Sequence, residues 1–111
     1  MNAAATTLLE ASARRLFPSL NLEQVWAELL LERAQKNLIK YQTMARRFEA
    51  RYGQTFASFR QTILDSQPAF EAEQDYFDWE LAITGIEDMK REIARLNLNE
   101  VEAVLAALGL P

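Results

Sequence analysis

The sequence predicts an all-α protein built on a long antiparallel helical hairpin, and three observations support this prediction. Apolar residues recur every three or four positions along most of the 111 residues, and no stretch alternates as a half-buried strand does. Only three glycines and three prolines interrupt this pattern. Two segments carry a strict apolar repeat of the coiled-coil kind. The length favours a single helical domain over residues 1–111.

Local signals bound the first two helices. A first helix is expected from about Ala3 to Phe17, because Pro18 cannot continue it. Its inner side is predicted to hold Leu8 or Leu9, Ser12 or Ala13, and Leu16. Asn21 and Gln24 form a capping-box pattern that begins a second, long helix. That helix is expected to reach Tyr52, where Gly53 supplies a left-handed end.

The two long helices each carry one apolar seam. In the second helix the seam consists of Ala27, Leu31, Ala34, Leu38, Tyr41, Ala45, Phe48 and Tyr52. In a later helix, from about Asp75 to Leu96, it consists of Trp79, Ala82, Ile86, Met89, Ile93 and Leu96. The antiparallel register pairs Phe48 with Ala82, Ala45 with Ile86, Tyr41 with Met89, Leu38 with Ile93, and Ala34 with Leu96. Small residues then mostly meet large ones, as interdigitating layers require.

Three short helices complete a small bundle. The third helix begins at Thr55, presents Phe56, Phe59 and Ile63 on one face, ends before Pro68 and closes the far end of the hairpin. Residues 66–74 are expected to be a loop or a frayed helical start. Asn99 is predicted to cap a fifth helix with Val101, Val104, Leu105 and Leu108 on one face, ended by Gly109. The first and fifth helices are expected to cover Leu22, Trp26 and Leu29, and weak self-association is expected if this cover is incomplete.

The composition excludes most enzyme classes. Without any cysteine or histidine, the chain has no thiolate nucleophile, no imidazole base and no common ligand for transition metals. It also has no glycine-rich phosphate loop. We therefore expect no enzymatic activity, no cofactor and no metal. Only the carboxylates of Asp75, Asp78 and Glu71 or Glu73 leave a carboxylate-based enzyme open.

The sequence carries no sign of a membrane protein. No apolar run approaches the ~18 residues that a membrane-spanning helix needs. The N-terminal residues lack the early basic cluster and the continuous apolar core of a secretory signal. A cytoplasmic location without membrane contact is therefore expected.

Charge is distributed unevenly along the chain. Residues 33–60 carry seven basic side chains against Glu49, whereas residues 61–88 carry eight acidic side chains and no basic one. The two blocks either neutralise each other across the hairpin or leave one face for a charged partner. Five of the eight acids crowd into residues 71–80, where only Arg51 and Arg60 are expected at close range. The sequence therefore predicts a binding surface for a basic protein, formed by Glu71, Glu73, Asp75, Phe77, Asp78 and Glu80.

Two further features of this region have alternative interpretations. Phe77 and Leu81 lie on the side of the helix away from its seam, so either the third helix covers them or they form an apolar spot among acids. The basic residues Arg33, Lys36, Lys40 and Arg47 fall on the outward face of the second helix. They are either a solvated face or the contact surface of a nucleic-acid-associated regulator. The net charge of −4 and the absence of a recognition motif make nucleic acid the less favoured partner.

Two segments carry a family resemblance. The run from Met44 to Phe59 (MARRFEARYGQTFASF) and the run from Asp75 to Ala82 (DYFDWELA), followed by Ile86, Met89 and Ile93, form a pattern of small helical proteins. Together they resemble uncharacterised bacterial, cyanobacterial and archaeal proteins encoded beside predicted toxins. The resemblance covers about residues 25–97 and implies an antitoxin-like, partner-binding role without catalytic residues. A nuclease toxin, with its basic RNA-binding cleft, is one partner that fits.

Overall fold

The computed structural model describes the backbone of residues 2–109 and the side chains of residues 2–97 and 106–109. In this part of the chain it contains four helices and no strand: α1 (Ala3–Leu16), α2 (Leu22–Tyr52), α3 (Phe56–Leu64) and α4 (Phe70–Ala107). The all-α class is therefore confirmed. The residues fall into two compact units, which we call the hairpin unit (residues 34–92) and the terminal unit (residues up to 33 and from 93). A single domain over residues 1–111 stays a prediction.

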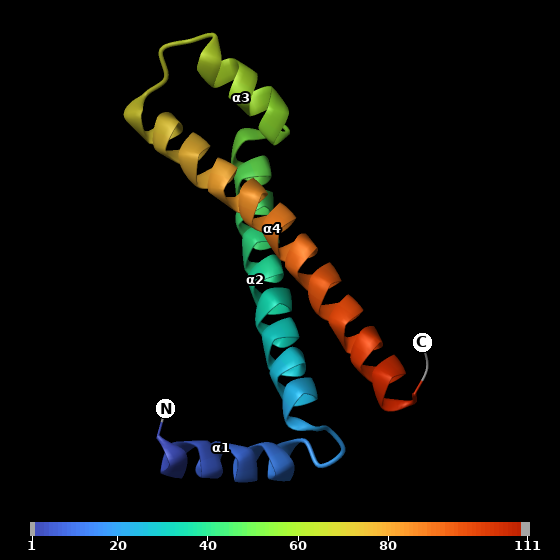
Figure 1. The fold of residues 1–111 in the computed structure, drawn as a ribbon. Coiled ribbons are helices and arrows are strands. Elements are labelled where there is room, and N and C mark those ends of the chain that lie inside the picture. The colour runs from blue at the N-terminus through green and yellow to red at the C-terminus, as the bar shows by residue number, and fades with distance from the viewer. Residues whose placement is uncertain (1, 110–111) are drawn as a thin grey trace. The chain divides into compact units, whose positions relative to one another are not determined.

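The hairpin unit consists of the second part of α2, α3 and the first part of α4. The two long helices run antiparallel and pack against each other, and α3 closes one end (Figure 1). Ala45, Phe59, Trp79 and Ala82 form its buried core. Met44, Phe48, Tyr52, Phe56, Ile63, Tyr76, Ile83 and Ile86 pack around that core. The core thus draws on the seams predicted for both long helices and on the predicted inner face of α3.

Aromatic rings surround Trp79 at the closed end of the hairpin unit. The indole has no exposed surface, and its ring centroid lies 5.3 Å from Phe59, 5.4 Å from Phe56 and 5.7 Å from Phe48. The ring of Tyr52 is tilted by 32° against that of Phe59, with 4.2 Å between the ring centroids. Such ring pairs contribute ~0.5–1.5 kcal/mol each beyond the burial of their surface. The aromatic residues concentrated between Phe48 and Trp79 therefore hold α3 onto the hairpin.

The described contacts across the hairpin include pairs one turn away from the predicted register. Phe48 stacks on Trp79, one turn before its predicted partner Ala82. Tyr41 lies against Gly85, one turn before its predicted partner Met89. Ile86 packs against the core that contains its predicted partner Ala45. The pairs that involve Ile93 and Leu96 stay predictions.

Three helix ends form as predicted. The backbone N–H of Gln24 donates to Asn21 Oδ1 at 2.9 Å, and the N–H of Asn21 donates to Gln24 Oε1 at 2.8 Å, which completes the capping box. Gly53 has a φ of 64° and its N–H donates to the carbonyl of Glu49, so it ends α2 in the left-handed conformation. Thr55 caps α3 by accepting from the N–H of Ser58.

The extent of α4 differs from the prediction at both ends. It begins at Phe70 rather than at Asp75, because the residues after Ala69 are good helix formers and place acids in the positive first turn. It also continues past Asn99 to Ala107, so the predicted fifth helix is wrong as a separate element. An asparagine inside a helix costs less than ~0.7 kcal/mol relative to alanine, and no glycine or proline stops the chain there. The predicted face of Val101, Val104 and Leu105 lies outside the described side chains.

The terminal unit is less buried than predicted. Asn2 caps α1 by accepting from the N–H of Ala5, but α1 has no buried residue. The predicted inner side held Leu8 or Leu9 together with Leu16, and all three leucines are more than half exposed. Leu22, Trp26 and Leu29, predicted to be covered, also keep large exposed surfaces. The prediction failed because the apolar spacing of α1 shows which face is apolar but not whether another element packs on it.

Candidate protein-binding surface

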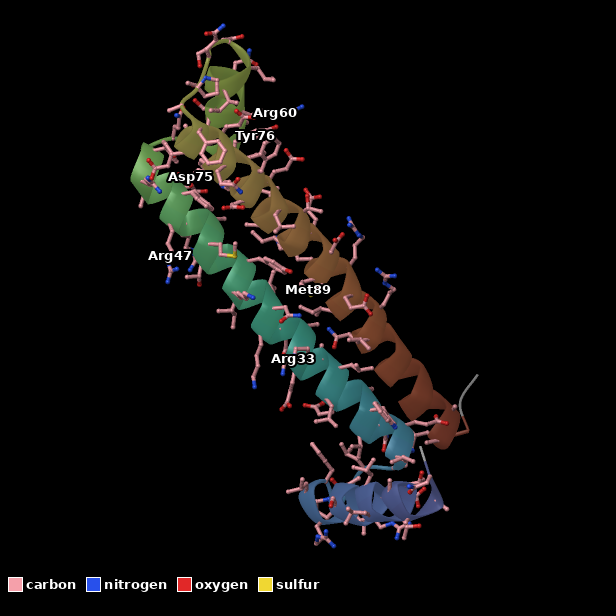
Figure 2. All side chains as sticks on the ribbon, turned by 90° about the vertical axis from the view of Figure 1, so that its left-hand side faces the viewer. Arg33, Arg47, Arg60, Asp75, Tyr76 and Met89 are labelled. Carbon is pink, nitrogen blue, oxygen red and sulfur yellow. The ribbon has the colours of Figure 1, made fainter. Side chains whose placement is uncertain are left out.

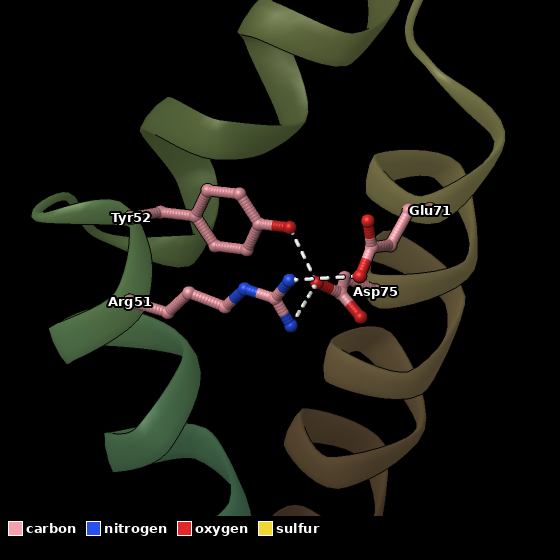
Figure 3. A network of polar contacts seen from close by, with 4 residues as sticks. All are labelled: Arg51, Tyr52, Glu71 and Asp75. Carbon is pink, nitrogen blue, oxygen red and sulfur yellow. Dashed lines mark hydrogen bonds and ion pairs between the residues drawn. The ribbon is translucent and has the colours of Figure 1, made fainter.

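The acidic first turns of α4 lie opposite the last turn of α2. Arg51 connects the two helices, because its Nη2 lies 3.1 Å from Glu71 Oε1 and its Nη1 lies 3.0 Å from Asp75 Oδ2 (Figure 3). The hydroxyl of Tyr52 donates a hydrogen bond to the same Asp75 oxygen. Two adjacent residues that end α2 thus hold two carboxylates one turn apart on α4.

This network is placed where both helix dipoles favour it. Arg51 stands at the negative C-terminal end of α2, and Glu71 stands at the positive N-terminal end of α4. The hydrogen bond with Glu71 and the charge of Asp75 raise the pKa of Arg51 above its ordinary value. Burial, and then the hydrogen bond to Asp75, raise the pKa of Tyr52. Both groups therefore keep their protons at neutral pH, and the network is intact there.

The network corrects part of the predicted binding surface. Asp75 is only 8% exposed, so its carboxylate is engaged inside the hairpin unit and is closed to a partner. Glu71 is exposed, but its charge is paired with Arg51. The sequence placed Arg51 near these acids, but it did not show that one guanidinium contacts both carboxylates. Arg60, the other expected cation, is exposed and makes no ion pair among the described residues.

The other predicted acids remain accessible to different degrees. Glu73 and Glu80 are exposed, and neither makes an ion pair or a side-chain hydrogen bond within the part of the chain that the structure describes. Asp78 is half-buried and accepts a hydrogen bond from Gln74 Nε2 at 3.2 Å. Asp78 also lines a shallow pocket of about 300 Å³ with Met44, Arg47, Phe48 and Arg51. The uncompensated negative charge is therefore concentrated at Glu73 and Glu80.

Two apolar side chains lie next to these acids. Phe77 is 55% exposed and touches only the edge of Tyr76 among the aromatic rings described, at 5.5 Å. Leu81, one turn further on, is 60% exposed. The structure thus decides between the two interpretations of this pair, because α3 leaves both side chains uncovered.

Helical spacing brings these four residues onto one face of α4. Glu73, Phe77, Glu80 and Leu81 stand at positions i, i+4, i+7 and i+8, which point in the same direction from a helix. All four are exposed. We call this set the α4 outer surface. It retains Glu73, Phe77 and Glu80 of the predicted binding residues, has Asp78 at its edge, and lacks Asp75.

The basic residues of the alternative site are also accessible. Arg33, Lys36, Lys40 and Arg47 are exposed, and none of them forms an ion pair with another described residue. Arg47 (Figure 2) is exposed, but it lines the shallow pocket that includes Asp78 of α4, so it lies on a side of α2 that borders α4. Arg33, Lys36 and Lys40 are exposed as the sequence predicts, whereas Arg47 borders α4 and does not lie on a face turned away from it. Exposure by itself fits a solvated face as well as a binding face.

The described residues show no arrangement suited to a metal or to a membrane span. Among them, no group of three or more acidic, histidine or cysteine side chains is placed to hold a metal ion. No helix in that same part of the chain is long and apolar enough to cross a bilayer.

The sequence alone does not reveal the polar role of Tyr52. Tyr52 was assigned to the apolar seam, yet its hydroxyl is one of the two donors that hold Asp75. The signal was present, because a tyrosine beside an arginine at the end of a seam can reach the acidic start of an antiparallel neighbour. Leu81 is expected from the sequence only as one half of an apolar spot with Phe77, and its exposure adds it to the α4 outer surface.

Comparison of the chain with protein-family models, with curated proteins and with solved structures gave no match in any of the three.

Proposed function

We propose that the protein is a non-enzymatic protein-interaction module that binds a basic protein through the α4 outer surface. The observation that carries this proposal is the contrast among the acids of residues 71–80. Glu71 and Asp75 share Arg51, whereas Glu73 and Glu80 are exposed without a counter-charge among the described residues. If the acids of α4 served only to neutralise the basic residues of α2, Glu73 and Glu80 would not lie unpaired beside exposed apolar side chains.

The chemistry of the surface defines its partner. Arg51 pairs with Glu71 and Asp75, and Arg47 lines a pocket with Asp78, whereas Glu73 and Glu80 have no counter-charge among the described residues. Negative potential of this kind steers a basic partner and raises its association rate. Phe77 and Leu81 add apolar contact area that charge alone does not supply, and aromatic side chains are often the anchors of protein interfaces.

An antitoxin-like role is the specific form of this proposal. The resemblance of residues 25–97 to proteins encoded beside predicted toxins supports it, and a nuclease toxin with a basic RNA-binding cleft would fit the acidic surface. In this role the protein would block the cleft and would need no catalytic group of its own. A cytoplasmic location belongs to the same proposal.

Capture from the native host tests the proposal when the variants are matched in charge. The tagged wild type is compared with Glu73→Lys/Glu80→Lys and with the control Glu32→Lys/Glu49→Lys, which makes the same charge change at exposed positions of α2. We expect one basic protein to be retained by the wild type and the control and lost with the α4 variant. Equal retention by all three, or retention of no specific protein, would contradict the proposal.

A nucleic-acid-associated regulator is the second candidate, supported by the exposed and unpaired state of Lys36, Lys40 and Arg47. Salt-dependent binding of labelled RNA or DNA distinguishes it, because phosphate contacts weaken steeply as salt rises. If Lys40→Glu/Arg47→Glu abolishes such binding, the basic face of α2 carries the function instead.

A further inference from the structure

The terminal unit contains an apolar groove between α1 and the beginning of α2. The groove has a volume of about 260 Å³, and its walls include Leu9 and Leu16 from α1 and Leu22, Trp26 and Leu29 from α2. Among the described residues of its lining, only Ser12 and the indole N–H of Trp26 offer polar side-chain atoms. Figure 1 shows α1 running across the beginning of α2, where the two helices are joined by the loop 17–21. A groove of this composition has nothing to recognise a charged ligand.

The side chains around this groove are exposed to an unusual degree. Trp26 is 56% exposed and Leu16 is 75% exposed. Leu8 and Leu30 are also at least half exposed, and they extend the apolar faces of α1 and α2 at positions one turn from Ser12 and from Trp26. Burying a side chain of this size removes roughly 100 Å² of apolar surface from water, so the seven large side chains together expose roughly 400 Å². This area falls within the ~300–600 Å² of the largest apolar patch on a typical monomer, and such a patch is often functional.

We propose that this groove is the interface of a homodimer, in which the Trp26 indole of each copy enters the groove of the other. The surface carries both parts of such a contact, because the indole that forms part of the groove wall is itself more than half exposed. In a dimer with two-fold symmetry, the indole of each copy would therefore occupy the groove of the other. A standard interface buries about 800 Å² per partner, of which about 57% is apolar, so the exposed patch supplies nearly the apolar area that one copy needs.

The charges at the rim of the groove also favour a second copy. Arg15 on α1 is exposed and donates to Ser12 Oγ at 3.1 Å, which places it beside the groove. Glu23 on α2 is exposed next to Leu22 and makes no ion pair with another described residue. Glu10 and Arg14 also lie next to the groove, beside Ala13, Leu22 and Val25, but they pair with each other. Because Arg15 and Glu23 carry opposite charges, a two-fold arrangement lets Arg15 of each copy approach Glu23 of the other. A partner of uniform charge would be repelled by one of the two.

This inference is independent of the proposed function. It uses residues of the terminal unit, whereas the α4 outer surface belongs to the hairpin unit. The chain could therefore form the dimer without binding a basic partner, or bind the partner as a monomer. The control variant Phe77→Glu, which changes the α4 outer surface alone, distinguishes loss of partner binding from loss of the dimer.

Sedimentation equilibrium of the full chain over a wide concentration range tests the dimer. We expect the apparent mass to rise from 12.7 kDa towards twice that value with concentration. Trp26→Glu and, separately, Leu16→Glu should weaken the dimer about 30-fold or more, since each buries a charge at the centre of the interface. Both residues are exposed in the monomer, so helicity by circular dichroism should be unchanged. Phe77→Glu, on the α4 outer surface, is the control and should dimerise as the wild type does.

A charge-swap pair tests the arrangement of the two copies. Arg15→Glu and Glu23→Arg should each weaken self-association, because like charges then face each other across the axis. An equimolar mixture of the two variants should restore dimers of wild-type affinity, as hetero-dimers. A mass that stays at 12.7 kDa at all concentrations would overturn the proposal. So would dimerisation that neither Trp26→Glu nor Leu16→Glu weakens, or a mixture that does not restore it.

Discussion

The ring of Tyr41 occupies the space that a side chain at Gly85 would need. A Cβ atom at position 85 would lie 2.7 Å from Cγ, Cδ2 and Cε2 of Tyr41. These atoms belong to a rigid ring, and Cγ is fixed close to the backbone of α2. The glycine is therefore required by the packing of the two long helices, although glycine in a helix interior is unfavourable by ~1 kcal/mol relative to alanine.

We predict that Gly85→Ala destabilises the protein despite its gain in helix propensity. Overpacking costs ~1–3 kcal/mol, which exceeds the ~1 kcal/mol that alanine contributes to the helix. Urea unfolding of Gly85→Ala, Tyr41→Ala and the double variant measures this effect. In the Tyr41→Ala background the substitution should become stabilising. If Gly85→Ala stabilises the wild-type background as well, the close approach of Tyr41 is refuted.

The network at the end of the hairpin should contribute to stability through Asp75. Tyr52→Phe removes one of the two donors that hold this buried carboxylate, and we expect a loss of about 1–2 kcal/mol in the free energy of unfolding. In a double-mutant cycle with Asp75→Asn, the coupling between the two residues should exceed ~0.5 kcal/mol. Glu71→Gln is the control, because an exposed ion pair contributes less than ~1 kcal/mol. Equal losses in the free energy of unfolding for Tyr52→Phe and Glu71→Gln would contradict the claim that the network stabilises the protein mainly through Asp75.

Stability should also depend on pH in the alkaline range through Tyr52. Burial and the hydrogen bond to Asp75 raise the pKa of Tyr52 above its ordinary value of 10.0. The unfolded chain then loses the phenolic proton at a lower pH than the folded chain, so the free energy of unfolding falls as pH rises above 10. The contribution is fully present below pH 10. Above pH 10, the melting temperature of Tyr52→Phe should fall less with rising pH than that of the wild type. If both melting temperatures fall equally, the pH dependence arises from other groups.

The core position of Ala45 can be tested against an exposed neighbour on the same helix. Ala45 is 5% exposed and belongs to the core with Trp79 and Ala82, so Ala45→Glu should cost several kcal/mol, on the order of 3 or more, by burying a charge. Lys40→Glu changes an exposed residue and should alter stability by less than about 0.5 kcal/mol. Comparable unfolding midpoints for the two variants would reject the assignment of the seam.

The sequence was sufficient where local chemistry decides the structure. The capping box of Asn21 and Gln24 and the left-handed Gly53 depend on neighbouring residues alone, and both form as predicted. The burial of Trp79 was also predictable, because the apolar repeat places it on the seam of α4.

The sequence was less informative about structure that depends on packing between elements far apart in the chain. Asn99 has the side chain of a helix cap, but it stands inside a continuous α4 because nothing there interrupts the backbone. The burial of Asp75 depends on the register between α2 and α4, which differs by about a turn between alternative pairings of the seams. For the same reason, the sequence does not show that Arg51 neutralises Glu71 and Asp75, which leaves the other acids for the candidate surface.

The most direct test of the α4 outer surface is the affinity of the captured basic partner, measured by titration at low and at physiological ionic strength. Wild type, Glu73→Lys/Glu80→Lys and the control Glu32→Lys/Glu49→Lys are compared after their helicity is confirmed. We predict that wild-type affinity falls as salt rises, that the α4 variant binds at least ~10-fold more weakly, and that the control stays close to wild type. Equal affinities for the three proteins, or a wild-type affinity indifferent to salt, would contradict the account.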